Sequence, residues 1–216
     1  MIAGIRFKVC GLTSLVDVEC ADKCGADYLG FNLYPKSPRH VSLEQYRALT
    51  KNLPDRRKIA ITVEPSLEEL VAMKAAGFDA FQIHFVSDTP LDTIKGWSDL
   101  VTPESLWLAP KLPPEQDVPV EWLALAKTFL IDTFSKNEFG GSGKTGDWDK
   151  FARLQKNHPN NTWVIAGGIS PENIGETLQK SEARFVDINS GVETAPGVKD
   201  HAKLKHFVVK LNEARG

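Results

Sequence analysis

Short apolar runs alternate along the chain with segments of helical spacing, and this alternation constrains the fold more than any other feature. The runs are rich in β-branched and aromatic residues, which predicts β-strands. They lie at residues 5–10, 28–33, 58–63, 80–84, 106–110, 128–132, 162–166 and 185–189. Strands that alternate with helices predict a parallel α/β sheet, and eight such repeats are the number that closes a (β/α)8 barrel. A doubly wound open sheet is the alternative that a count of strands leaves open.

The segments between the runs carry the marks of helices. Apolar residues recur at helical spacing in residues 43–53, 67–75 and 204–211. Ser42 predicts a helix start with Gln45, because each side chain can accept a hydrogen bond from the other residue's backbone N–H group. The helices after the fourth and fifth runs are the least well defined, and the prolines of residues 110–122 predict an irregular loop there.

Composition and charge argue against several classes of partner. A net charge of −2 gives no reason to expect nucleic acid or an anionic membrane. No apolar stretch approaches the roughly 20 residues of a membrane span. The first residues lead directly into the first strand, so we expect no signal peptide. Three cysteines, an odd number, do not suggest a disulfide framework, so we expect a cytoplasmic protein. A chain of 216 residues can bury its own core, so we expect one catalytic domain over residues 1–216 and a monomer rather than a homodimer.

Cys10 and Asp132 each end an apolar run, at the first and the sixth predicted strand. In a (β/α)8 barrel, the strand ends that lead into helices form the catalytic face. Loops are polar in general, but that does not explain a thiol and a carboxyl group at the last positions of two buried strands. We therefore predict that Cys10 and Asp132 form an acid–base pair.

Glycines follow the seventh and eighth strands, where such barrels commonly bind phosphate. Gly167 and Gly168 come after the seventh strand, and Ser190 and Gly191 come after the eighth. Glycine lets the backbone approach an anion closely, and a serine hydroxyl can donate a hydrogen bond to it. We therefore predict a phosphate site between these two loops.

A third glycine-rich segment, residues 140–145, resembles a nucleotide-binding P-loop but lacks one of its glycines. The P-loop pattern requires glycine five residues before Gly143, where this chain has Glu138. The segment also follows the sixth strand rather than the first. We interpret Gly141 and Gly143 as parts of a loop whose N–H groups can face an anion, with a plain surface loop as the alternative.

Arg39 and His84 are the remaining candidates at the strand ends. Arg39 follows the second strand and could hold a carboxylate by a bidentate pair, with a solvated surface charge as the alternative. His84 ends the fourth strand. A histidine there is more often a hydrogen-bonded residue of the barrel mouth than a catalytic base.

Together these segments resemble the phosphoribosylanthranilate isomerase family of tryptophan biosynthesis. The resemblance runs from the first strand to the last helix, and no single segment carries it alone. Its segments are residues 8–13, 25–31, 34–39, 82–84, 130–132, 140–145 with 147–148, 166–169 with 171–173, and 186–193.

The resemblance implies an Amadori rearrangement, in which N-(5-phosphoribosyl)anthranilate becomes 1-(2-carboxyphenylamino)-1-deoxyribulose 5-phosphate. It implies that Cys10 is the general base, that Asp132 is the general acid and that Arg39 holds the anthranilate. The substrate-binding residues expected on this basis are Arg39, His84, Gly141, Gly143, Gly167, Gly168, Asp187, Ser190 and Gly191. No metal or organic cofactor is expected, because the imine formed from the substrate accepts the electrons. Cys20 and Cys24 lack the further ligands of a zinc site and are expected in the core.

The reaction requires a particular protonation state of Asp132 and of Cys10. Asp132 must be protonated, which requires a carboxyl pKa raised by partial burial. Cys10 must become a thiolate, which requires a positive charge nearby. We expect the side chain of Lys8, two residues earlier, to lie on the other face of the strand, so the sequence indicates no cation for Cys10.

Two positions depart from the resembled pattern, and two alternatives stay open. Phe85 replaces the usual glycine and is expected near the barrel mouth, and Asn189 replaces a serine. The related isomerase of histidine biosynthesis has an aspartate at the end of strand one, where this chain has Cys10, and two similar half-barrels, of which we find no trace. A phosphate-binding barrel without activity is the other alternative, and it needs neither Cys10 nor Asp132.

Overall fold

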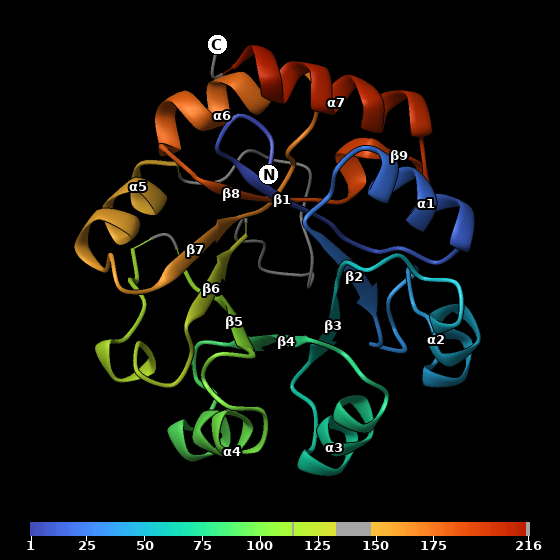
Figure 1. Cartoon of the computed structure of the whole chain (residues 1–216). Coiled ribbons are helices and arrows are strands. Elements are labelled where there is room, and N and C mark those ends of the chain that lie inside the picture. The colour runs from blue at the N-terminus through green and yellow to red at the C-terminus, as the bar shows by residue number, and fades with distance from the viewer. Residues whose placement is uncertain (114, 133–147, 215–216) are drawn as a thin grey trace.

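Eight parallel strands form a closed barrel in the computed structural model, which describes residues 1–113, 115–132 and 148–214 (Figure 1). The strands are β1 (Arg6–Val9), β2 (Tyr28–Asn32), β3 (Arg57–Val63), β4 (Ala80–Val86), β5 (Leu106–Lys111), β6 (Thr128–Ile131), β7 (Thr162–Ile165) and β8 (Phe185–Ile188). They pair in chain order, and β8 pairs with β1 to complete the ring. The predicted barrel is confirmed and the open-sheet alternative is wrong, because a closed ring has no edge strand.

Helices surround the barrel and cover its outer face (Figure 1). They are α1 (Leu15–Lys23), α2 (Leu43–Thr50), α3 (Leu67–Ala75), α4 (Leu91–Val101), α5 (Trp148–Asn157), α6 (Ile174–Ser181) and α7 (His201–Glu213). Ser42 and Gln45 form the predicted capping box at the start of α2. Between β5 and β6 the described residues form one short 3₁₀ turn, η1 (Val120–Trp122), in keeping with the predicted irregular loop.

Two apolar cores result from the alternation of side chains along the strands. One lies between the strands and the helices. The other fills the inside of the barrel with a cluster that includes Tyr28, Trp107 and Phe185, whose rings pack with centroids 4.9–5.5 Å apart. These three residues lie near the beginnings of their strands, so they fill the end of the barrel opposite the predicted site.

A short hairpin follows β8 and carries charged residues toward the mouth of the barrel. The turn η2 (Ser190–Val192) leads into β9 (Glu193–Ala195) and β10 (Val198–Lys199), which pair antiparallel. Asp17 on α1 fixes the hairpin, because its carboxylate accepts hydrogen bonds from the Lys199 backbone N–H at 3.3 Å and from His201 Nε2 at 2.7 Å. The hairpin therefore has a fixed place beside the end of β8.

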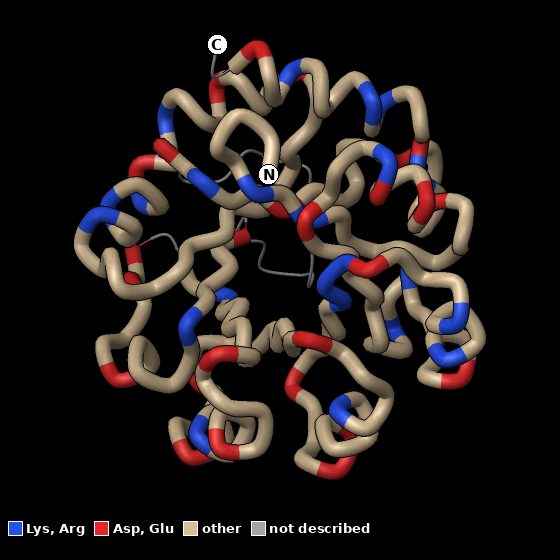
Figure 2. The backbone as a smooth tube through the Cα atoms, viewed as in Figure 1, with Lys and Arg blue, Asp and Glu red and all other residues tan. Residues whose placement is uncertain are grey.

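Charged residues of both signs are interspersed over the outer helices and loops (Figure 2). No helix among the described residues has the length and apolar character needed to cross a membrane.

Candidate active site

A pocket opens at the carboxyl ends of the strands and collects most of the predicted site residues. The predicted residues that line it are Cys10, Arg39, His84, Asp132, Gly167, Gly168, Asp187 and Ser190. Gly191 lies outside this lining, in the turn after β8, and packs against the loop after β7. Gly141 and Gly143 fall outside the described residues.

Cys10 and Asp132 reach the same pocket from two strands that are separated by β7 and β8. Cys10 directly follows β1, and its backbone N–H donates to the Ile188 carbonyl at 2.8 Å, which continues the strand pairing by one residue. Its side chain is buried, with 6% of its surface exposed. Asp132 directly follows β6 and is partly exposed. The arrangement brings a thiol and a carboxyl group to one cavity.

The Lys8 side chain lies inside the barrel beneath Cys10, so the expectation that it points to the other face is wrong. Side chains alternate along a strand, and positions two apart therefore share a face. Lys8 is fully buried, and its Nζ lies 2.8 Å from Asp187 Oδ1. Gly30 provides the space, because a Cβ atom at that position would lie 2.8 Å from Lys8 Cε and 3.2 Å from Cys10 Cα.

Burial and charge act in opposite directions on Cys10. Burial is the largest effect and holds the pKa of its thiol above the ordinary value. The ammonium groups of Lys8 and Lys199 lower that pKa, and the Asp187 carboxylate raises it. Burial lowers the pKa of Lys8, but the charges of Asp187 and Cys10 outweigh it and hold that pKa above its ordinary value. Lys8 is therefore a cation at neutral pH. Burial holds the pKa of Asp187 above its ordinary value although the charge of Lys8 lowers it, and the 2.8 Å contact with the ammonium makes this carboxylate, expected to bind substrate, the counter-ion of Lys8.

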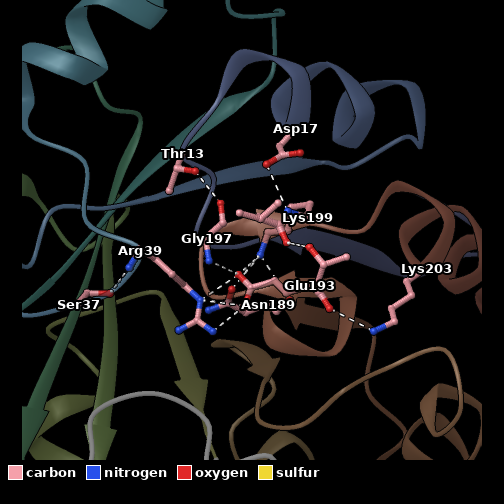
Figure 3. Close-up of polar contacts among 11 residues, drawn as sticks. Thr13, Asp17, Ser37, Arg39, Asn189, Glu193, Gly197, Lys199 and Lys203 are labelled. Atoms are coloured by element: carbon pink, nitrogen blue, oxygen red, sulfur yellow. Dashed lines mark hydrogen bonds and ion pairs between the residues drawn. The ribbon is translucent and has the colours of Figure 1, made fainter.

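Arg39 is held at the edge of the pocket by Glu193, a contact that the sequence did not indicate (Figure 3). Arg39 Nε lies 2.9 Å from Glu193 Oε1, and Nη2 lies 2.6 Å from Oε2. Lys199 Nζ binds the same carboxylate at 2.9 Å and Asn189 Oδ1 at 2.9 Å. Burial raises the pKa of Glu193, but the two cations outweigh it and hold that pKa below its ordinary value. Glu193 is thus ionised, and Asn189, the departure from the resembled pattern, is an acceptor for Lys199.

His84 is neutral at physiological pH. Burial lowers its pKa to about 4, and the charge of Lys8 acts in the same direction. Its Nε2 lies 2.8 Å from Gln82 Nε2, so the neutral ring can accept a hydrogen bond from that amide. Gln82 Oε1 is buried without a hydrogen-bond partner in the described part of the chain, and Gln82 lines the pocket. The amide therefore offers an unused acceptor beside the pocket.

Phe85 points away from the barrel mouth, which corrects its expected place. It neighbours His84 on β4 and therefore faces the opposite side, toward the helices. Its ring packs in edge contacts with Trp97, at a centroid distance of 5.7 Å, and Trp122, at 5.2 Å. The bulky ring belongs to the outer core and leaves the pocket unobstructed.

The loops after β7 and β8 lie in direct contact. Gly167 and Gly168 both have positive φ, 95° and 64°, a conformation that favours glycine. Gly191 lies so close to the seventh loop that a Cβ atom there would lie 2.1 Å from the Ile169 carbonyl oxygen. Ser190 lines the pocket beside Gly167 and Gly168. The two predicted phosphate loops thus share one part of the cavity.

Comparison with known proteins places this geometry in a family. The model of the family "N-(5′-phosphoribosyl)anthranilate (PRA) isomerase" matches residues 7–210. The chain is 33% identical over 209 residues to N-(5′-phosphoribosyl)anthranilate isomerase of Aquifex aeolicus, an alignment that covers 94% of this chain and 97% of the relative.

Two solved structures share the fold over nearly their whole length. One is a generated monomer of the dimeric phosphoribosylanthranilate isomerase of Thermotoga maritima, with a TM-score of 0.79 and 28% identity. The other is a phosphoribosylanthranilate isomerase in complex with reduced 1-(o-carboxyphenylamino)-1-deoxyribulose 5-phosphate, with a TM-score of 0.77 and 27% identity. Each alignment covers 97% of this chain and 99% of the other.

Proposed function

The chain belongs to the N-(5′-phosphoribosyl)anthranilate isomerase family, and we propose that Cys10 is the general base and Asp132 the general acid of its reaction. The reaction is an Amadori rearrangement in tryptophan biosynthesis, which converts an N-linked aldose phosphate into a 1-amino-1-deoxyketose phosphate. The observation that carries the assignment is the presence of both side chains at one pocket, on strands that bring them to it from different sides.

The first step opens the sugar ring. Asp132, as a neutral acid, donates a proton to the ribose ring oxygen while the bond between that oxygen and C1 breaks. The nitrogen lone pair forms the C1=N bond of an iminium ion. Partial exposure at the edge of the barrel allows Asp132 to exchange its proton with solvent between turnovers.

The second step moves the unsaturation along the sugar. The Cys10 thiolate removes the proton from C2, and the electrons of that C–H bond form a C1=C2 bond as the iminium returns to an amine. The resulting enolamine gains a proton at C1 and loses its hydroxyl proton, which gives the ketose. The iminium accepts the electrons throughout, so no cofactor is part of the proposal.

Arg39 and the glycine loops are proposed to hold the two ends of the substrate. Glu193 occupies the Nε and Nη2 edge of the guanidinium. The Nη1 group is then available to the anthranilate carboxylate, and the excess of two cations over one carboxylate in this cluster favours an anion. Ser190 and the backbone of Gly167 and Gly168 line the part of the pocket that suits the phosphate.

Gln82 and His84 are proposed to contact the sugar between these two ends. The neutral His84 ring holds the Gln82 amide by its nitrogen, which directs Oε1 as an acceptor for a hydroxyl or amine of the substrate. A donor from the substrate would satisfy a buried oxygen that otherwise costs free energy.

Fluorescence tests the activity directly. Purified protein is mixed with freshly generated phosphoribosylanthranilate, and the decay of its fluorescence is followed against a blank and against the Cys10→Ser variant. We expect a rate well above the blank that falls at least about 10²-fold in the variant. A wild-type rate no faster than the blank would leave the barrel as a phosphate-binding protein without this activity.

The assembly and location of the protein are also proposals. We propose a cytoplasmic monomer, because the closed barrel buries its own core and the three cysteines are free. Light scattering on a gel-filtration column should return a molar mass near 23.9 kDa. A value near twice that mass would indicate a dimer, as described for the Thermotoga maritima relative.

A further inference from the structure

We propose that Lys8 is a positioning residue of the reaction: its ammonium group, fixed inside the barrel by Asp187, supplies the positive charge against which Cys10 becomes a thiolate. The proposal rests on the proposed function in one respect, the role of Cys10 as base. It assigns a task to a buried cation that touches neither end of the substrate in the proposed mode of binding.

The complete burial of Lys8 and its position next to Cys10 support this role. Lysine is among the residues least often buried completely, because removing an ammonium group from water is costly. Here the side chain is fully buried and packs against Gly30, and its Nζ lies 2.8 Å from Asp187 Oδ1. Lys8 also shares a strand face with Cys10, so its chain runs directly beneath the thiol. A hydrophobic residue would fill the same space at lower cost.

The buried charges around Cys10 leave one cation in excess among the described residues. The cations are Lys8, Lys199 and Arg39, and each has an electrostatic interaction with Cys10. The carboxylates are Asp187, paired with Lys8, and Glu193, paired with both of the other cations.

The remaining titratable groups do not remove this excess. His84 on β4 is neutral near pH 7, and Asp132 on the far side of the pocket is uncharged in its proposed role. A thiolate at Cys10 therefore balances the cluster, and buried charges are stable when they are paired.

Lys8 is better placed than Lys199 to act on the thiol. Lys199 Nζ already binds the Glu193 carboxylate and the Asn189 side chain, at 2.9 Å each. Lys8 has one carboxylate partner, and its charge acts on Cys10 more strongly than that of Lys199. Asp187 holds the Lys8 ammonium in place but also opposes the thiolate with its own charge. The charges of Lys8 and Asp187 thus shift the pKa of Cys10 in opposite directions.

This opposition gives a test that a purely structural pair would not pass. The rate of alkylation of Cys10 by iodoacetamide is measured against pH in the substrate-free protein. Mass spectrometry of the peptide that contains Cys10 separates it from Cys20 and Cys24. Lys8→Met should raise the pKa of the thiol and slow alkylation at pH 8 at least about tenfold, equivalent to one pKa unit. Asp187→Asn should lower the pKa and speed alkylation.

Two further variants serve as controls for folding and for the loss of a nearby charge. Lys8→Met with Asp187→Leu removes both charges, so it should fold even if a lone buried carboxylate does not, and its thiol pKa should fall between those of the two single variants. Lys36→Met removes an exposed lysine at the rim of the same pocket and should leave the alkylation profile unchanged.

The alkylation profile is independent of isomerase activity. An unchanged profile in Lys8→Met, or shifts of the same sign in Lys8→Met and Asp187→Asn, would refute the role of Lys8 even if the wild-type enzyme is active. If the shifts are opposite but the wild-type protein does not isomerise phosphoribosylanthranilate, the proposed function fails and the electrostatic coupling stands. In an active enzyme, Lys8→Met should also move the acidic limb of the pH profile of kcat/KM to higher pH.

Discussion

The guanidinium of Arg39 and the carboxylate of Glu193 form a two-point ion pair, with Nε–Oε1 and Nη2–Oε2 distances of 2.9 and 2.6 Å. The pair joins the loop after β2 to the hairpin after β8, across 154 residues of sequence. Lys199 shares the carboxylate, so the guanidinium is held by an ion-pair network at the edge of the pocket (Figure 3). Arg39 is therefore held in place by residues that need not touch the substrate.

Replacing Arg39 with alanine should raise KM about 10- to 100-fold and change kcat little. Loss of a charge-assisted pair to a substrate carboxylate costs about 1.5–3 kcal/mol, and a contact made equally in the ground and transition states appears in KM. Arg39→Lys should not restore KM, because lysine lacks the bidentate edge. Arg153→Ala, which removes an exposed arginine on α5, is the control and should have wild-type constants. A fall in kcat at unchanged KM would contradict a binding role for Arg39.

His84 should titrate with a midpoint near pH 4 when the imidazole signals of the folded protein are followed by NMR. Its folded pKa lies below the ordinary 6.5, so the unfolded chain binds this proton more readily. The contribution of His84 to stability is complete above about pH 6.5 and declines as the pH falls toward about 4. Comparison with His84→Gln assigns the signal. A midpoint near 6.5 would contradict the neutral acceptor that we assign to this ring.

Gly191→Ala should destabilise the protein by about 1–3 kcal/mol in urea unfolding, the usual cost of overpacking. Its Cβ would lie 2.1 Å from the Ile169 carbonyl oxygen, a backbone atom that cannot move aside without shifting the seventh loop. Gly175→Ala is the matched control, because no atom lies within 4 Å of its Cβ position on α6. That change should stabilise the protein by about 0.5–1 kcal/mol. Equal effects of the two substitutions would contradict close contact between the phosphate loops.

Phe85→Ala should lower the free energy of unfolding by about 3–5 kcal/mol while KM stays near the wild-type value. The ring is fully buried between Trp97 and Trp122, outside the barrel, so its loss leaves a cavity on the face of β4 opposite the pocket. Kinetics should be measured at a temperature where the variant is folded. A KM change larger than about tenfold with little loss of stability would place Phe85 at the pocket instead.

The repeat of strands and helices could be predicted from sequence because apolar periodicity and caps such as Ser42 are local signals. The meeting of Cys10 and Asp132 at one pocket also followed, since all strand ends of a barrel share one face. The predicted positions of the Lys8 and Phe85 side chains were wrong for a single reason: each side chain was assigned to the wrong face of its strand. Along a strand, position 8 shares a face with 10, and position 85 opposes 84. Correct alternation would have placed both side chains.

The partners of Arg39 could not be predicted in the same way. Glu193 and Lys199 lie in a hairpin after the eighth strand, and nothing near them in sequence indicates a contact with a loop 154 residues earlier. Such pairs depend on how the barrel closes, because β8 must lie beside β1 before the hairpin can reach the second loop. The roles of Gly141 and Gly143 stay predictions, as both lie outside the described residues.

The kcat of Asp132→Asn tests the central claim most directly. The amide keeps the size of the side chain but cannot donate the proton that opens the ribose ring. We therefore expect kcat for the isomerisation of phosphoribosylanthranilate to fall at least about 10²-fold, with KM nearly unchanged. A kcat close to that of the wild type would show that another group protonates the ring oxygen and would contradict the acid–base pair of Cys10 and Asp132.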